Sequence, residues 1–267
     1  MEQPKNNLKI VADKKSARML LPNMLTLIGV CIGLTSIRFA LDGRFELAII
    51  AIMFAALIDG LDGRIARLIK GTSKVGKELD SLTDMISFGV APVFIMYFWK
   101  LNTLGRFGWL LCLVFVICVA LRLARFNINS NQEPSWRDNF FEGVPSPAGG
   151  ILVLTPLIVS LSGFDFFELN YDLIVPIFFV TTSFLLISKF PSYSFKKIVI
   201  RRRTTIFLLF GIVLFFGLLL IYTFNVIAIS AIIYLLLLPI SYVHYQKIKN
   251  KHEKDKIQDE DDLEDVL

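Results

Sequence analysis

The sequence is poor in histidine and cysteine, the residues that ligate most transition metals and carry out much nucleophilic catalysis. Both of its two histidines, His244 and His252, lie near the C-terminal end of the 267-residue chain. We therefore expect no histidine-ligated metal and no histidine catalyst, unless that end folds back onto the core. The three cysteines lie inside apolar runs, which is typical of small hydrophobic residues and not of a disulfide framework. They are Cys31, Cys112 and Cys118.

Charged residues are also scarce, at 19% of the chain, whereas 55% of the residues are hydrophobic. A mean hydropathy of +0.63 excludes an ordinary soluble domain of this length. The apolar residues come in blocks and do not alternate, so a β-barrel is not expected. The expected fold class is all-α, a polytopic bundle of about eight membrane-spanning helices. The candidate spans are residues 20–38, 45–63, 85–99, 107–124, 148–162, 173–189, 204–223 and 225–244.

The basic residues separate cleanly when the chain is threaded through the membrane with its N-terminus in the cytoplasm. Of the 28 Lys and Arg residues, 24 then fall in cytoplasmic segments, as the positive-inside rule requires. The pattern predicts a multi-pass protein of the cytoplasmic (inner) membrane with both termini in the cytoplasm. The basic N-terminal flank has no small-residue cleavage pattern after it, so we interpret it as a retained cytoplasmic segment.

Four parts follow from this patterning. They are a cytoplasmic N-terminal segment at residues 1–19, a membrane core at 20–200, two C-terminal membrane helices at 201–246 and a charged cytoplasmic tail at 247–267. The tail alternates basic and acidic residues and ends strongly acidic, which is typical of a solvated, disordered extension. Gly29 and Gly33 form a small-xxx-small pair in the first span, a pattern compatible with a helix contact.

Residues 56–89 do not fit a plain membrane span, because they carry aspartates at the adjoining ends of two consecutive helices. Asp59 and Asp62 are three residues apart and share one face of the first helix. Asp80 and Asp84 are four residues apart and share one face of the second. The short connection makes the helices antiparallel neighbours, so both faces can point at a common space. A bare carboxylate near hydrocarbon costs several kcal/mol, so such groups are normally paired or functional.

Four ionised aspartates have a formal charge of −4, which would drive the helices apart unless cations lie between them. Two divalent cations would neutralise this charge, and all-oxygen ligation favours Mg²⁺ or Mn²⁺ over zinc. A two-metal site suits displacement at a phosphorus centre. The alternative for either pair alone is ordinary snorkelling or a salt bridge to Arg64 or Arg67.

The residues between the acids fit a ligand that carries phosphate. Gly63 lies one turn after the first acid and would let a ligand approach the backbone. Arg67 places a guanidinium one turn further on, and guanidinium pairs well with phosphate oxygens. Thr72 and Ser73 are candidate caps of the next helix, and Gly76 would keep that helix thin where the two pack.

Together these residues resemble the signature of the CDP-alcohol phosphatidyltransferase family, D-x-x-D-G-x-x-A-R-x8-G-x-x-x-D-x-x-x-D. Every specified position is matched at the correct gap, by Asp59, Asp62, Gly63, Ala66, Arg67, Gly76, Asp80 and Asp84. Polyprenyl synthases also gather acids around a magnesium-bound diphosphate, but their motif lacks this glycine, arginine and second-acid pattern. The resemblance assigns the membrane core at 20–200 to this family.

The resemblance implies a role for each matched residue. The acids would hold two divalent cations on the diphosphate of a CDP-linked lipid, through Asp59, Asp62, Asp80 and Asp84. Asp84 would also be the catalytic base that takes the proton from the acceptor hydroxyl. The CDP moiety would contact Asn23, Gly63, Arg67 and Ser73. Asn23 lies in a segment, residues 22–25, that resembles the family's N-terminal CDP-binding segment, although a helix cap is an equal alternative for this residue.

Two further stretches resemble the serine-using branch of the family, the bacterial membrane-type phosphatidylserine synthases. They are SFGVAP at 87–92, and LRLARFN at 121–127 followed by GVPSPA at 143–148. The resemblance implies CDP-diacylglycerol as donor and L-serine as acceptor, with phosphatidylserine and CMP as products. A serine pocket needs a cation and hydrogen-bond acceptors, and the candidates are Arg122, Arg125 and Asn127. For the two arginines, plain positive-inside placement is the alternative.

Other functions stay open at this point. The same chemistry on glycerol 3-phosphate, inositol phosphate or another alcohol is the nearest alternative, and Arg122 and Arg125 could supply the extra cations that a phosphorylated acceptor needs. An ion-coupled transporter is a different class, but transporters place ionisable groups near the bilayer midplane, often in inverted repeats. The acids of this chain gather at one interface, and no repeat is evident. The resemblance also implies a homodimer, and nothing suggests a nucleic-acid partner.

Overall fold

The computed structural model describes residues 14–69, 73–129, 140–163, 170–193 and 202–264, which are almost wholly helical. The α-helices are α1 (Lys14–Leu41), α2 (Phe45–Leu68), α3 (Lys74–Asp84), α4 (Ala91–Trp99), α5 (Arg106–Asn129), α6 (Ser146–Leu161), α7 (Tyr171–Ile187), α8 (Arg202–Ile221) and α9 (Thr223–Glu264). A π-helical turn, η1 (Met85–Val90), joins α3 to α4, and a 3-10 turn, η2 (Leu101–Leu104), follows α4. Two short antiparallel strands, β1 (Phe140–Glu142) and β2 (Pro191–Tyr193), pair with each other. The predicted all-α class is confirmed.

Each of the eight predicted spans coincides with helix, but not every helix has the length and composition of a membrane span. Within the described residues, four segments meet both criteria: Leu21–Leu41, Val75–Trp99, Arg106–Ile128 and Thr223–Ile248. Three apolar helices are shorter: Ser146–Leu161, Tyr171–Ile187 and Thr205–Ile221. The protein is therefore a helical membrane protein, and the count of eight crossings stays a prediction.

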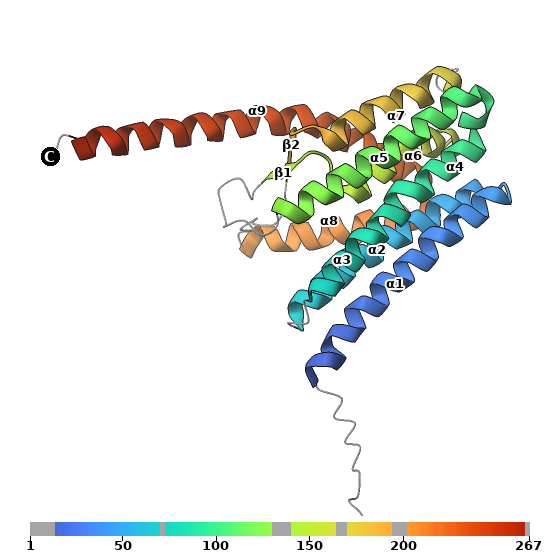
Figure 1. Ribbon diagram of the computed structural model, residues 1–267, viewed down its shortest axis with the longest axis horizontal. Helices are drawn as coiled ribbons and strands as arrows, with labels where there is room; N and C mark the ends of the chain where they lie inside the picture. The colour runs from blue at the N-terminus through green and yellow to red at the C-terminus, as the bar shows by residue number, and fades with distance from the viewer. Residues whose placement is uncertain (1–13, 70–72, 130–139, 164–169, 194–201, 265–267) are drawn as a thin grey trace, which may run out of the picture.

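The helices pack side by side around a core of large apolar side chains. In Figure 1, α1 lies beside α2 and beside the rod formed by α3, η1 and α4, and α5, α6 and α7 lie on the other side of that rod. Phe88, Phe115 and Phe179 are among the largest fully buried residues. The rings of Phe115 and Phe179 meet edge-on with centroids 5.7 Å apart, which joins α5 to α7.

The small-residue pair of the first span lies at a close helix contact. A Cβ added to Gly33 would lie 2.6 Å from Ser87 Oγ and 3.1 Å from Ser87 Cα. A Cβ at Gly29 would lie 3.5 Å from Thr83 Cγ2. Both positions therefore let α1 approach the α3–η1 rod, and the helix contact that the pattern suggested is present.

The π-helical turn η1 is enclosed by three other helices. Gly33 of α1 makes the first of these contacts. From α6, a Cβ added to Gly150 would lie 3.1 Å from the Phe88 carbonyl oxygen. A Cβ at Gly89 would lie 3.2 Å from Val119 Cγ1 of α5. An apolar run such as SFGVAP gives no sequence sign of a π-turn, which inserts one extra residue into the helix and so changes its phase directly after Asp84.

The C-terminal helix α9 runs without a break from Thr223 to Glu264 and extends beyond the rest of the bundle in Figure 1. The tail expected as a disordered extension is thus helical to Glu264. Its sequence explains the difference, because Lys, Glu and Gln are good helix formers and the tail contains neither Gly nor Pro. The four-part division of the chain stays a prediction.

Candidate active site

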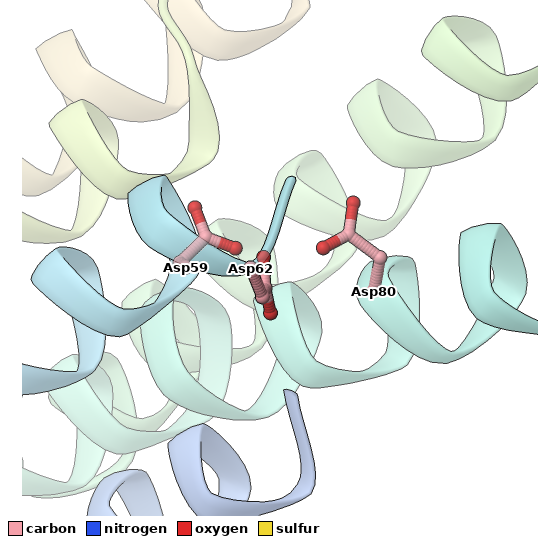
Figure 2. A group of neighbouring side chains, drawn as sticks. All are labelled: Asp59, Asp62 and Asp80. Carbon is pink, nitrogen blue, oxygen red and sulfur yellow. The ribbon is translucent and has the colours of Figure 1, made fainter. Parts of the chain in front are cut away.

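The C-terminal part of α2 and the facing helix α3 bring the predicted acids together. Carboxylate oxygens of Asp59, Asp62 and Asp80 all lie within 4.8 Å of one another. Figure 2 shows Asp59 and Asp62 on α2, with the Asp80 carboxylate directed toward them from α3. Asp84, one turn further along α3, has Asp59 and Asp80 as electrostatic neighbours. The four acids thus form one cluster, as the spacing predicts.

The donor set of this cluster fits divalent cations. Asp62 is only 3% exposed. Its Oδ1 atom and Oδ1 of Asp84 are buried and have no hydrogen-bond partner among the described residues. In the part of the chain that the structure describes, no salt bridge joins the acids to Arg64 or Arg67. Close carboxylate oxygens that no salt bridge occupies are the ligands that Mg²⁺ and Mn²⁺ prefer.

A cavity of about 470 Å³ opens beside the acids between α1, α2 and α3. Asp62 and Asp80 form part of its wall. The four residues expected to contact CDP all line it as well: Asn23, Gly63, Arg67 and Ser73. Positions that are distant in sequence therefore share one polar cavity with the acids.

Local contacts explain why this cavity has its shape. Ser73 caps α3, because its Oγ accepts a hydrogen bond from the Gly76 backbone N–H at 2.9 Å. A Cβ at Gly76 would lie 2.9 Å from Asn23 Oδ1, so only glycine lets α1 approach this closely. The predicted cap at Ser73 and the close packing at Gly76 are confirmed, whereas the CDP contact of Ser73 stays a prediction and Thr72 lies outside the described residues.

Thr26 is a site residue that the sequence analysis missed. Its hydroxyl donates to Asp62 Oδ2 at 2.7 Å and so orients this carboxylate from a different helix. Thr26 also lines the cavity. Its position one turn after Asn23, on the same face of the first span, was the available signal.

Arg122 is on α5, which lies on the other side of the rod of α3, η1 and α4 from α1 (Figure 1). It is 7% exposed, and its guanidinium donates to the hydroxyl of Ser146 at the start of α6. Asp84 is an electrostatic neighbour of this guanidinium. Arg122 Nε has no partner among the described residues. Of the three candidates for acceptor binding, Arg122 is the one that the structure places beside Asp84.

The other two candidates make contacts that stabilise the bundle. Arg125 donates to the carbonyl oxygens of Ile187, at 2.7 Å, and Leu186, at 3.1 Å, so it caps the C-terminal end of α7. Asn127 Nδ2 donates to Ser81 Oγ at 2.9 Å and ties α5 to α3 between two of the acids. A role for either residue in acceptor binding stays a prediction.

Comparison with known proteins agrees with the geometry. The family model for CDP-alcohol phosphatidyltransferase matches residues 19–237, which contain the whole acid cluster. The chain is 43% identical over 176 residues to CDP-diacylglycerol–serine O-phosphatidyltransferase from Mycobacterium leprae, covering 64% of this chain and 57% of the relative. The Helicobacter pylori protein of the same name is 38% identical over 179 residues, covering 67% and 74%.

A third relative with this name, from Bacillus subtilis, is 34% identical over 177 residues, covering 66% of this chain and 92% of the relative. The chain spans less than two thirds of the length of the mycobacterial relatives that it matches. The family match extends over most of the chain and includes every position of the aspartate signature. This protein therefore belongs to the CDP-alcohol phosphatidyltransferase family.

Proposed function

We propose that this protein is a CDP-diacylglycerol–serine O-phosphatidyltransferase, which makes phosphatidylserine and CMP from CDP-diacylglycerol and L-serine. The observation that carries the proposal is the cavity of about 470 Å³ in which Asp62 and Asp80 of the acid cluster lie together with the candidate CDP contacts. The acceptor is inferred from Arg122, which lies beside Asp84, and from the relatives that bear this name.

The cavity is the site for the CDP moiety and its diphosphate. Arg67 provides a guanidinium for phosphate oxygens, and the missing side chain of Gly63 lets the diphosphate approach the α2 backbone. Asn23 of α1 and Ser73 at the start of α3 supply neutral polar contacts in the same cavity. The lipid tails remain in the bilayer, so the donor enters sideways.

The acids are the ligands for two divalent cations, Mg²⁺ or Mn²⁺. Such ions, when bound, stabilise negative charge that develops on the diphosphate oxygens. Thr26 holds Asp62 Oδ2 and leaves Oδ1 directed to a ligand. Asp59 and Asp80 face each other across the gap between α2 and α3.

Asp84 is the general base for the acceptor. It takes the proton from the serine hydroxyl, whose oxygen forms a new bond to the phosphorus of the phosphatidyl group. The bond from this phosphorus to the CMP oxygen breaks, and CMP leaves. Arg122 pairs with the serine carboxylate and so fixes the hydroxyl near Asp84.

We further propose the orientation and assembly that the sequence pattern predicts. Both termini and the acid cluster lie on the cytoplasmic side of the inner membrane, and the protein is a homodimer. Residues 20–200 form the catalytic membrane core, residues 201–246 add two membrane helices, and residues 247–267 form the tail.

CMP release by the purified protein in detergent tests this proposal. With CDP-diacylglycerol and Mg²⁺ or Mn²⁺, we expect release with L-serine and not with glycerol 3-phosphate, inositol, inositol phosphate or choline. Chelator and Asp84→Asn should each abolish release, with a loss on the order of a thousandfold or more. Asp42→Asn is the matched control, because Asp42 is an exposed residue paired with Arg38 and should retain full activity.

Each other outcome has a defined meaning. Release with a different alcohol would preserve the acid cluster but overturn serine as the acceptor. If folded protein releases no CMP with any acceptor, the transferase proposal is overturned. That result would favour the transporter alternative, because a transporter has no reason to require a CDP-linked lipid.

A further inference from the structure

Among the described residues, a small set of buried side-chain polar atoms has no hydrogen-bond partner. The set consists of Asp62 Oδ1, Asp84 Oδ1, Arg122 Nε, the Tyr234 hydroxyl and Ser241 Oγ. Buried polar atoms are nearly always paired, so each exception requires an explanation. The aspartates belong to the acid cluster, and Arg122 lies beside it. Tyr234 belongs to no motif, and nothing described above explains it.

Tyr234 reaches this region from the C-terminal helix α9. That helix packs on α6 and on β2, and its buried face includes Ala231 and Leu238, one turn to either side of Tyr234. Arg122 is an electrostatic neighbour of the tyrosine, and the hydroxyl of Ser192 lies beside it. The Ser192 hydroxyl donates to the Gly143 carbonyl at 2.9 Å, and the Tyr234 hydroxyl is left without a partner.

The Tyr234 side chain also borders a second cavity, of about 190 Å³, between α2, α6, α8 and α9. Apart from Ser230 and the tyrosine, its lining residues are apolar, among them Met53, Ile151 and Leu219. Tyr234 thus lies between an apolar cavity and the polar cluster at Arg122. An apolar boundary lowers the local dielectric and strengthens any hydrogen bond made to a charged group on the polar side.

The unpartnered atoms around Asp84 fit an acceptor alcohol that has a hydroxyl at one end and an anionic group at the other. Asp84 Oδ1 is free to accept a hydrogen bond from a ligand, as a base for a hydroxyl must. Arg122 Nε and the Tyr234 hydroxyl are both hydrogen-bond donors, and neither has a hydrogen-bond acceptor among the described residues. An anionic group on the acceptor alcohol would satisfy the two donors together, whereas a neutral alcohol would leave both unpaired.

We propose that Tyr234 is a specificity-determining residue of the acceptor subsite, where its hydroxyl donates a hydrogen bond to the carboxylate that pairs with Arg122. This inference rests on the proposed function, because it takes the anionic group to be the carboxylate of serine. A phosphorylated alcohol offers the same anionic chemistry, so the test compares L-serine with glycerol 3-phosphate. The C-terminal helix α9 thereby contributes to substrate choice.

Kinetics of Tyr234→Phe test the inference. The variant keeps the ring and removes only the hydroxyl, so we expect the KM for L-serine to rise about tenfold or more. The KM for CDP-diacylglycerol should stay unchanged, because its cavity does not include Tyr234. Tyr242→Phe is the matched control on the same helix, since the Tyr242 hydroxyl is exposed and accepts a hydrogen bond from Gln246.

The inhibition constant of L-alanine distinguishes a contact with the carboxylate from a purely structural role of Tyr234. L-Alanine has the carboxylate and ammonium of serine but no hydroxyl to phosphatidylate. Its inhibition constant should rise by the same factor as the KM for serine. L-Alaninamide lacks the carboxylate and should inhibit the wild-type protein and Tyr234→Phe equally. Equal weakening of both inhibitors would indicate general damage and overturn the inference.

The wild-type protein gives a test that needs no variant. Serinol has the ammonium and hydroxyl of serine without the carboxylate, so its kcat/KM should be at least about a hundredfold lower. Comparable use of serinol would overturn the inference and leave the family chemistry intact. Unchanged serine kinetics in Tyr234→Phe would overturn the inference alone. Wild-type activity with glycerol 3-phosphate but not L-serine would overturn the proposed function and the carboxylate assignment together.

Discussion

At the scale of single residues, Asp62 shows how the site depends on contacts between helices. One oxygen of its carboxylate accepts a hydrogen bond from Thr26 of α1, and the other is buried without a partner. An outer hydrogen bond of this kind fixes the orientation of a metal ligand. The two oxygens therefore differ, and the one left unpaired is the one available to a cation in the proposed metal site.

Thr26→Val should weaken metal binding while it preserves the shape of the side chain. Loss of the outer hydrogen bond typically costs tenfold to a hundredfold in metal affinity, so half-maximal CMP release should need about tenfold more Mn²⁺ or Mg²⁺. A metal titration at saturating substrates measures this shift. Thr35→Val is the matched control, because Thr35 is exposed on the same helix and its hydroxyl donates to the Cys31 carbonyl oxygen. An unchanged metal requirement would show that Thr26 does not orient a ligand.

At the scale of elements, the acids depend on how closely α1 approaches the α3–η1 rod. Gly33 of α1 meets Ser87 at this contact, and Ser87 lies in η1, directly after the last acid of α3. The η1 turn is also enclosed by α5 and α6, and its residues Ser87, Phe88 and Gly89 are buried, so the turn has little room to move. A larger residue at the α1 contact must displace backbone.

Gly33→Ala should destabilise the protein, because the new Cβ would lie 2.6 Å from Ser87 Oγ and 3.1 Å from Ser87 Cα. Overpacking of this kind costs about 1–3 kcal/mol, which outweighs the roughly 1 kcal/mol that alanine gains over glycine in a helix. Thermal unfolding in detergent should show a lower midpoint. Gly211→Ala in α8 is the control: its Cβ meets no atom within 4 Å, so its midpoint should be unchanged or higher. Equal midpoints for the two variants would contradict the packing argument.

At the scale of the whole molecule, the acid cluster and the proposed external loops lie at opposite ends of the bundle. The α1–α2 connection and η2 lie at one end in Figure 1, and the C-terminal end of α2 and the start of α3 lie at the other. Lys100, next to η2, pairs with Asp172 of α7 at 3.1 Å, so the start of α7 belongs to the first end. Arg64 and Arg67 of α2 and Lys77 of α3 belong to the second end.

Labelling of single introduced cysteines tests the orientation. In intact cells, a membrane-impermeant maleimide should label Asp42→Cys, in the proposed external connection. The exposed Leu68→Cys, at the acid end of α2, should be labelled only after permeabilisation. The parent protein, with its own three cysteines, gives the background signal. The reverse labelling pattern would place the active site outside the cytoplasm.

Much of this protein was determined by the sequence itself. Helices occupy all eight apolar blocks, because long apolar runs at the membrane leave helices as the stable backbone arrangement. The acids form one cluster because spacings of three and four residues place each pair on one face, and a short connection makes the helices neighbours. Gly63, Arg67 and Ser73 share a cavity with the acids because each lies close to the acids in the sequence of α2 or at the start of α3. Asn23 joins them only through the packing of α1 against Gly76.

Only the tertiary structure decided which residues complete the site. Ser146 and Tyr234, the proposed specificity residue, come from two different helices, and no spacing in the sequence relates them to the acids. Thr26 shares a helix face with Asn23, but only packing places it against Asp62. Arg122 and Arg125 are one turn apart, yet one lies beside Asp84 and the other caps α7. Local sequence sets which face of a helix a side chain occupies, but the neighbour of that face depends on how the helices pack. That packing sets which buried polar atoms find a partner within the protein and which are left for a ligand.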